Sequence, residues 1–439
     1  MHQELFVSTS VIGALYFLTS RRCFDYYTIA YFGSLAYFLP GFFGYTAFHI
    51  GGVWSENEIN NETYLVLITV TTSIWLCAQI GSNIRNPIKT NIRIPNKKFP
   101  VNALLFLSTL GATILVLSAG NSIHDADKTA VMENLGRWHI LFYSAAALGL
   151  PLSYATKQYK ALFLFFCLLC FDLYLGFRST IAISIISLIT VHLASKSKLR
   201  LASEQLKIIL LMLFIGAFFF LYKVIAFSVK SGMWDLVIDR LSDGNTYAIM
   251  ITRSEPFVIQ QILNEVISKD FRVDIINVLS AFNQFILFGP EIGLGVSSFN
   301  DLFQPTLFPS VEYGMASNIW AQMWSAGGWG LLLFFIILFN LTLAVGNATL
   351  KSPSPIIRAG FAPAFVYWAF YIHRNDISYA INIEKRLLLI LVGCVLFSYI
   401  LHYLSKGRLR SHSKKGSMPF PVEIDFSTNM MIGGTTARH

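Results

Sequence analysis

The chain has 439 residues, of which 54% are hydrophobic, 15% aromatic and only 13% charged. A soluble domain of this length would not stay in solution with so few charges, so the composition excludes a soluble globular protein and predicts an all-α, polytopic membrane protein. The formal net charge of +9 does not imply a nucleic-acid partner, because basic residues in a membrane protein first report topology.

Apolar segments long enough to cross a bilayer recur along the chain, and we count about eleven of them. They lie at roughly 4–20, 25–49, 63–82, 101–119, 137–154, 160–176, 180–195, 207–228, 320–345, 359–372 and 386–404. The expected organisation is an N-terminal membrane bundle over 1–228, a large loop over 229–319, C-terminal spans over 320–404 and a disordered basic tail over 405–439.

The loops between these segments alternate in charge. Lys and Arg gather after the first segment and around 85–98, 157–160, 196–200, 351–358 and 406–410, whereas the intervening loops are acidic or mixed. The positive-inside rule then predicts an extracytoplasmic N-terminus, a cytoplasmic C-terminus, and the 229–319 loop on the outer face. Asp125-Ala126-Asp127 in an outer loop has the spacing of a metal-binding pair, but a solvated acidic loop is the favoured interpretation, and no metal or cofactor is predicted.

The large outer loop contains a segment with helical periodicity that begins near Pro256, a residue suited to a first helical turn. Such a helix lies on the membrane surface or covers a cavity. A second apolar stretch runs from Ile275 to Leu287. The apolar face of the first helix is formed by Val258, Ile259, Ile262, Leu263 and Val266, and the polar face by Gln260, Gln261, Asn264 and Glu265.

Arg178 lies within an apolar run from about 161 to 193, and a charge placed there indicates a functional site by default. A structural ion pair with Asp172 is the alternative. Arg253 precedes the amphipathic helix, where it could instead hold lipid head groups, and Arg374 lies in the last outer turn. The topology places the three arginines on one membrane face. Guanidinium groups match phosphate oxygens, so a pyrophosphate at the outer leaflet is the expected ligand.

Four short motifs in this order resemble the Wzy-type polymerases of bacterial surface polysaccharides, over roughly the C-terminal two thirds of the chain. They are Gly176-Phe177-Arg178-Ser179 between two spans, Thr252-Arg253-Ser254 after Asn245 and Tyr247, Gly327-Gly328-Trp329-Gly330 after Ser317-Asn318, and His373-Arg374-Asn375-Asp376 before the last span.

The resemblance implies a GT-C-like helical bundle in the bacterial inner membrane, with its active site facing the periplasm. Such enzymes transfer the growing glycan from its undecaprenyl-pyrophosphate to the non-reducing end of a new lipid-linked unit, and a Wzz-type co-polymerase is an expected partner. Cations would stabilise the leaving pyrophosphate without a metal, which is the role expected of Arg178, Arg253 and Arg374. The candidate bases for the acceptor hydroxyl are Glu312, Glu291, Asp376 and His373, with Glu255 a further carboxylate, although a histidine in such a turn is more often structural.

Two alternatives stay open. An O-antigen ligase would use the same donor, but its outer loop is expected to carry a catalytic histidine and none occurs between Lys230 and Ser325. A flippase or other transporter of lipid-linked oligosaccharide should line several spans with ionisable residues. Here only Asp172 and Lys223 lie well inside the expected spans.

Overall fold

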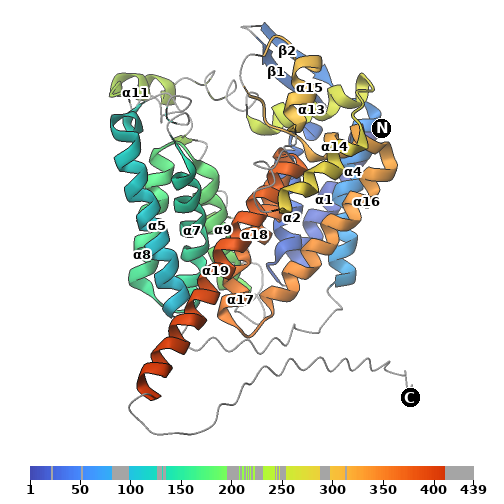
Figure 1. Ribbon diagram of the computed structural model, residues 1–439. Helices are drawn as coiled ribbons and strands as arrows, with labels where there is room; N and C mark the ends of the chain where they lie inside the picture. The colour runs from blue at the N-terminus through green and yellow to red at the C-terminus, as the bar shows by residue number, and fades with distance from the viewer. Residues whose placement is uncertain are drawn as a thin grey trace, which may run out of the picture.

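The computed structural model describes residues 1–20, 23–50, 53–81, 98–125, 131, 135–194, 231–242, 254–286, 297–311 and 314–410, together with single residues between 207 and 247. These residues form a mostly helical protein of two bundles joined by a central group of helices (Figure 1).

The first bundle contains α1 (His2–Leu15), α2 (Tyr26–Tyr37), α4 (Asn61–Gly81) and α16 (Ile319–Leu350). A π-helical turn, Tyr16–Ser20, extends α1. Buried aromatic residues such as Phe6, Tyr31 and Phe339 belong to one hydrophobic cluster that spans these helices.

The second bundle contains α5 (Lys98–Ala119), α7 (Arg137–Ala155), α8 (Tyr159–Tyr174) and α9 (Arg178–Ala194). A 3₁₀ turn, Gly120–His124, follows α5. A separate cluster that includes Leu104, Phe165 and Leu391 forms its core.

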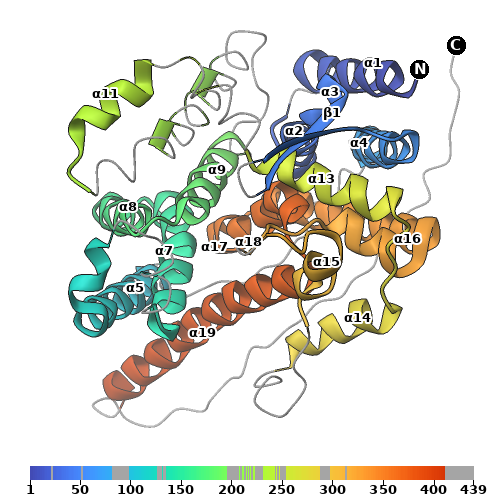
Figure 2. The same ribbon diagram turned by 90° about the horizontal axis from the view of Figure 1, so that it is seen from above.

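The C-terminal helices lie between the bundles, as the view from above shows (Figure 2). They are α17 (Pro355–Gly360), α18 (Ala362–Val366), the turns Tyr367–Tyr371 and Ile372–Arg374, and the long α19 (Ile377–Arg410). Residues around 366–381 belong to the first core and those around 356–364 and 387–394 to the second. The C-terminal segment therefore joins both cores.

Five helices in the described part of the chain are long and apolar enough to cross a membrane. The remaining expected spans are either helices of 12 to 19 residues or fall in 207–228, most of which lies outside the described residues. The protein thus has the features of a membrane protein, and the number eleven stays a prediction. The five helices are Asn61–Gly81, Lys98–Ala119, Ile319–Leu350, Pro355–Arg374 and Ile377–Leu404.

Two expected boundaries are wrong. The apolar segment 25–49 is not one helix, because α2 ends at Tyr37 and the chain continues through α3 (Pro40–Phe43) into an antiparallel hairpin, β1 (Tyr45–Ile50) and β2 (Val53–Glu58). The protein is therefore not purely α-helical. The last outer turn is also shorter than expected, because α19 starts at Ile377 and includes Glu384 and Arg386.

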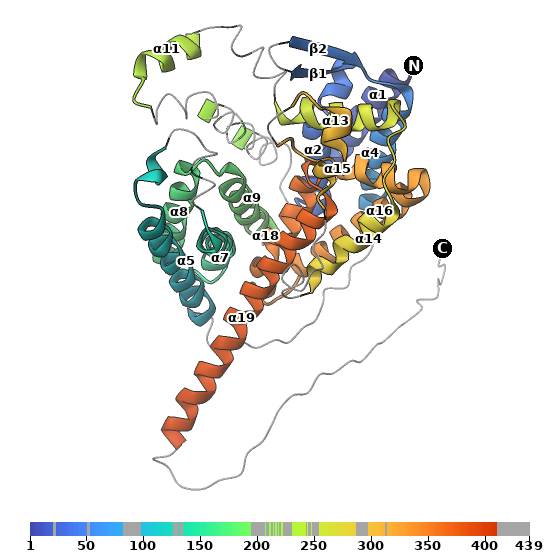
Figure 3. The ribbon, with the colours of Figure 1, turned by 45° about the horizontal axis from the view of Figure 1, so that its top comes forward.

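The described parts of the 229–319 loop, which is predicted to lie outside, form α11 (Trp234–Ser242), α13 (Glu255–Ser268), α14 (Ile275–Ser280), a 3₁₀ turn (Ala281–Phe285) and α15 (Phe299–Leu307). The hairpin, α11, α13 and α15 lie toward the same end of the molecule, whereas α14 lies alongside α16 (Figure 3).

The amphipathic helix expected after Pro256 is α13, but its polar face is buried as well as its apolar face. Asn264 accepts the backbone N–H of Asn60 at 3.0 Å and donates to the carbonyl of Glu58 at 3.0 Å. Gln261 hydrogen bonds with Thr46 in β1. The polar face therefore binds the hairpin. We refer to α13, α15 and the β1–β2 hairpin together as the cap.

Candidate functional site

Arg178 begins α9 after a tight turn at the end of α8. Gly176 has a φ of +102°, a conformation that glycine adopts without a steric penalty. The turn is closed by hydrogen bonds from the N–H of Gly176 to the carbonyl of Leu173, at 2.9 Å, and from the N–H of Phe177 to that of Asp172, at 3.1 Å. The turn places the partly buried Arg178 at the start of α9, and its predicted position at the outer membrane face stays a prediction.

Arg374 is the last residue of the apolar segment Pro355–Arg374, immediately before α19. Its Nη1 lies 2.5 Å from Oε2 of Glu255 in α13, and its Cζ lies 4.7 Å from the centre of the Tyr371 ring. The backbone carbonyl of Arg374 accepts the N–H of Ser317 at 3.1 Å. Arg374 is three-quarters buried, and its Nε has no hydrogen-bond partner among the described residues.

Tyr371 connects the two arginines. The charges of Arg374 and Arg178 both act on its phenol group, and the hydroxyl of Ser179 interacts with the same group. Two of the three arginines identified in the sequence therefore lie near one tyrosine. The first is carried by α9 and the second by the turn before α19.

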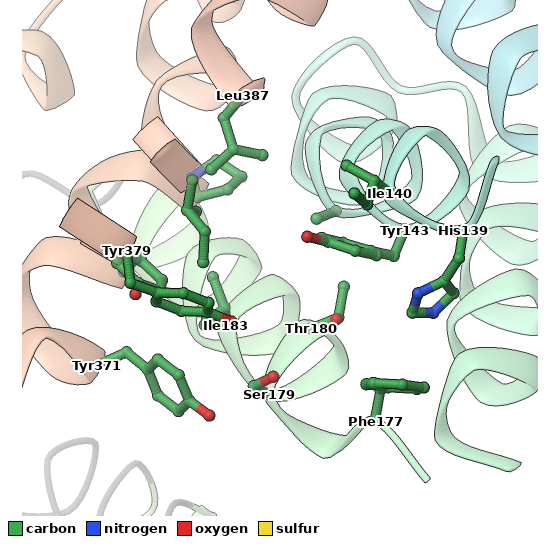
Figure 4. Close-up of a pocket in the computed structure, with 14 residues that line it drawn as sticks. His139, Ile140, Tyr143, Phe177, Ser179, Thr180, Ile183, Tyr371, Tyr379 and Leu387 are labelled. Carbon is green, nitrogen blue, oxygen red and sulfur yellow. The ribbon is translucent and has the colours of Figure 1, made fainter. Parts of the chain in front are cut away.

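A cavity of about 200 Å³ opens beside Tyr371, between α7, α9 and the segment from α18 to α19 (Figure 4). Hydroxyl groups and one imidazole project into an otherwise apolar lining. The polar residues of its wall are His139, Tyr143, Ser179, Thr180, Tyr371 and Tyr379. A concave, mostly apolar site with a few converging polar groups is the usual form of a ligand pocket.

Asp172 does not pair with Arg178, which was the structural alternative for the intramembrane charge. Asp172 is fully buried, and its Oδ1 lies 2.7 Å from Nε2 of His139 in α7. Its Oδ2 has no hydrogen-bond partner among the described residues. The charge of Arg178 is therefore not neutralised by Asp172.

Asp376 has a clear role in the local fold. It is buried, its Oδ1 accepts the N–H of Tyr379 at 2.7 Å, and its Oδ2 accepts the N–H of Phe299 at 3.0 Å. Burial raises the pKa of Asp376, and these backbone donors oppose that rise. The carboxylate caps α19 and ties α15 to it, so it does not project into the cavity.

His373 is fully buried in an aromatic cage away from the cavity wall. Its Nδ1 accepts the indole N–H of Trp320 at 3.1 Å, and the rings of Tyr37, Phe38 and Phe339 lie within 6.2 Å of its own. This position favours the structural interpretation of His373 that the sequence left open.

Arg253, Glu291 and Glu312 lie outside the described residues, so their expected roles stay predictions. The same is true of Ala126 and Asp127 in the acidic outer loop. Within the described ranges, no three His, Cys, Asp or Glu side chains lie close enough together to hold a metal.

Sequence reasoning missed Tyr371 and His139. Nothing in the sequence separates Tyr371 from the other aromatic residues of a membrane helix. Asp172 did indicate that a partner such as His139 should exist, because a carboxylate in an apolar segment needs a hydrogen-bonding or charged partner. His139 lies at the outer end of the preceding apolar segment, where a partner for Asp172 could have been sought.

Comparison with protein-family models, curated proteins and solved structures found no match to this chain.

Proposed function

We propose that this protein is a membrane glycosyltransferase that polymerises lipid-linked oligosaccharide repeat units at the outer face of the bacterial inner membrane. The donor would be a glycan on undecaprenyl pyrophosphate, and the acceptor the non-reducing end of a second lipid-linked unit. The observation that carries the proposal is the convergence of Arg178 and Arg374 on Tyr371, beside a cavity at the outer end of the helices.

The chemistry of the transfer explains why two arginines would be held there. Breaking the bond between an anomeric carbon and a pyrophosphate places negative charge on the departing oxygen. Preorganised cations stabilise that charge where it develops, most strongly in a site that excludes water. Arg178 at the start of α9 and Arg374 beside the cap would each bind the phosphate groups of the donor.

The outer cap gives the arginines an environment that a bare helical bundle would lack. Glu255 in α13 holds Arg374, and Asp376 fixes α15 against α19. The cap thus lies directly over the end of the helices from which a lipid-linked glycan would approach. A chain-length co-polymerase of the Wzz type is the expected protein partner, and the bilayer supplies the lipid-linked substrates.

The proposal is tested by incubating the purified protein in nanodiscs with lipid-linked repeat units, extracted from host cells that lack this protein. We expect a ladder of glycan lengths that persists in the presence of a chelator. Transfer only after addition of lipid A core would instead identify a ligase. Movement of the lipid-linked unit across the bilayer without a glycan product would identify a transporter.

A further inference from the structure

His139 and Asp172 form a buried pair at the wall of the cavity. His139 is 6% exposed and Asp172 fully buried, and the distance of 2.7 Å between Nε2 and Oδ1 is that of a strong hydrogen bond. Figure 4 shows the imidazole at one side of the pocket, near Tyr143 and Phe177. The ring of Phe177 lies 4.4 Å from that of His139, centre to centre, and that of Tyr143 lies 5.1 Å away.

The pairing determines which nitrogen of His139 can accept a proton. An ionised carboxylate only accepts hydrogen bonds, so in the ionised pair Nε2 carries the hydrogen that it shares with Asp172. In a neutral imidazole the other nitrogen, Nδ1, is then an acceptor. The structure therefore contains an oriented imidazole on the wall of a cavity that also contains Ser179 and Tyr371, next to the two arginines.

The cost of the arrangement also points to a function. A carboxylate buried in an apolar bundle, with one oxygen unpaired among the residues that the structure describes, is expensive, and a structural histidine would not need it. A carboxylate behind an imidazole becomes useful when the imidazole must take up a proton, because the negative charge stabilises the imidazolium that forms.

We propose that His139 is the general base of the transfer reaction and that Asp172 is its positioning residue. This inference rests on the proposed function, and it adds a base to the pyrophosphate site. It also assigns the acceptor hydroxyl to the part of the cavity near Thr180 and Tyr143, and the donor pyrophosphate to the part near Tyr371.

The proposed step balances without a cofactor. The oxygen of the acceptor hydroxyl forms a bond to the anomeric carbon of the donor glycan while its proton passes to Nδ1 of His139. The bond from the anomeric carbon to the pyrophosphate oxygen breaks, and its electron pair leaves on the pyrophosphate held by Arg178 and Arg374. The imidazolium later returns its proton to solvent.

His139→Gln is the sharpest test, because the glutamine amide can still donate to Asp172 while the basic nitrogen is lost. We expect the turnover number for lipid-linked repeat units in nanodiscs to fall by about 10²–10⁴-fold, with the KM for these units changed by less than about threefold. Asp172→Asn should also lower turnover with little change in KM. The double variant should be no slower than His139→Gln alone, because both changes affect one proton transfer.

His192→Gln is the matched control. His192 is a half-buried histidine on α9 that hydrogen bonds with Tyr154 of α7, and it does not line the cavity. This variant should keep wild-type turnover. The elution profile and thermal unfolding temperature of each variant show whether it is folded.

The outcomes separate the two proposals. If the wild-type protein makes no glycan ladder, the proposed function fails before the base is considered. If the wild type makes a ladder and folded His139→Gln makes it at the same rate, only the assignment of the base is overturned. If His139→Gln does not fold, wild-type turnover in a folded Asp172→Asn variant overturns the assignment instead.

Discussion

At the scale of single residues, Arg178 and Arg374 differ in how the protein holds their charges. Arg374 has a carboxylate partner in Glu255 and an aromatic ring beneath it, so most of its charge is compensated before any ligand arrives. Arg178 follows a turn that places it at the start of α9, and Asp172 in α8, the acid nearest to it in sequence, is engaged by His139. Arg178 is therefore the cation with more of its charge available to a pyrophosphate.

We accordingly expect Arg178→Ala to lower the rate of polymerisation by about 10²–10³-fold, the loss typical of removing one donor to a developing anion. Glycan ladders measured on purified protein in nanodiscs check this. Arg272→Ala is the control, because Arg272 is half-exposed, pairs with Asp270 and lies outside the cavity wall. A normal ladder from folded Arg178→Ala would show that Arg178 does not bind the leaving group.

Glu255→Gln should strengthen pyrophosphate binding. Glu255 now competes with any anion for Arg374, and an ion pair that is partly exposed contributes about 1 kcal/mol or less. Its removal should therefore lower the inhibition constant of inorganic pyrophosphate by a few-fold, about fivefold at most. Glu265→Gln on the same helix, where Glu265 pairs with Lys269, should leave the inhibition constant unchanged. Weaker inhibition of Glu255→Gln would mean that Glu255 instead orients Arg374 toward the ligand.

At the scale of elements, α16 contains a break at Gly327 and Gly328, where the sequence predicts one continuous span over 320–345. Gly327 and Gly328 depart from helical geometry, and Gly328 has a φ of +56°. The break separates the first turns of α16, where the indole of Trp320 donates to His373 and the carbonyl of Trp324 accepts from Arg272, from the rest of the helix. Only a residue without a side chain adopts this conformation at low cost.

Gly328→Ala should therefore destabilise the protein by about 1 kcal/mol or more, because the left-handed conformation strains any side chain. Gly330→Ala, two residues further along a regular part of the same helix and with open space around it, should be neutral or slightly stabilising. Thermal unfolding in detergent compares the two variants. Equal stability of both would indicate that the break in α16 is not maintained in the folded protein.

The contacts within the cap could not be predicted from local sequence patterns. The periodicity of α13 predicted a helix, but not that Gln261 and Asn264 would bind a hairpin from the N-terminal part of the chain. The hairpin could not be predicted because Tyr45, Ala47 and Phe48 continue an apolar run, and such a run in a membrane protein predicts a helix. Pairing between β1 and β2 depends on tertiary contacts and cannot be predicted from the sequence of either strand alone.

At the scale of the whole molecule, the candidate site lies between two bundles with separate cores. Arg178 and His139 belong to helices of the second bundle, whereas Arg374 lies under a cap that rests on the first (Figure 1). The arginines could be predicted from the sequence because each is a charged residue in or beside an apolar segment. It could not show which of them meet, since that depends on how α17 to α19 pack between the bundles.

The orientation of the chain is open to a direct check. In a variant whose native cysteines are replaced by serine, Asp125→Cys should react with an impermeant maleimide on intact spheroplasts, because the loop after α5 is predicted to be outside. Tyr159→Cys, at the start of α8, should react only after the membrane is permeabilised. Both positions are exposed in the folded protein. The reverse pattern would place the two arginines on the cytoplasmic side and contradict an outer-face reaction.

The most direct test of the account is an electron cryomicroscopy structure of the protein bound to undecaprenyl pyrophosphate in a nanodisc. We predict density for the pyrophosphate between the guanidinium groups of Arg178 and Arg374, at the end of the cavity near Tyr371, with the lipid chain entering between the bundles. A pyrophosphate bound elsewhere, with both arginines free of it, would contradict the central claim that these residues form the donor site.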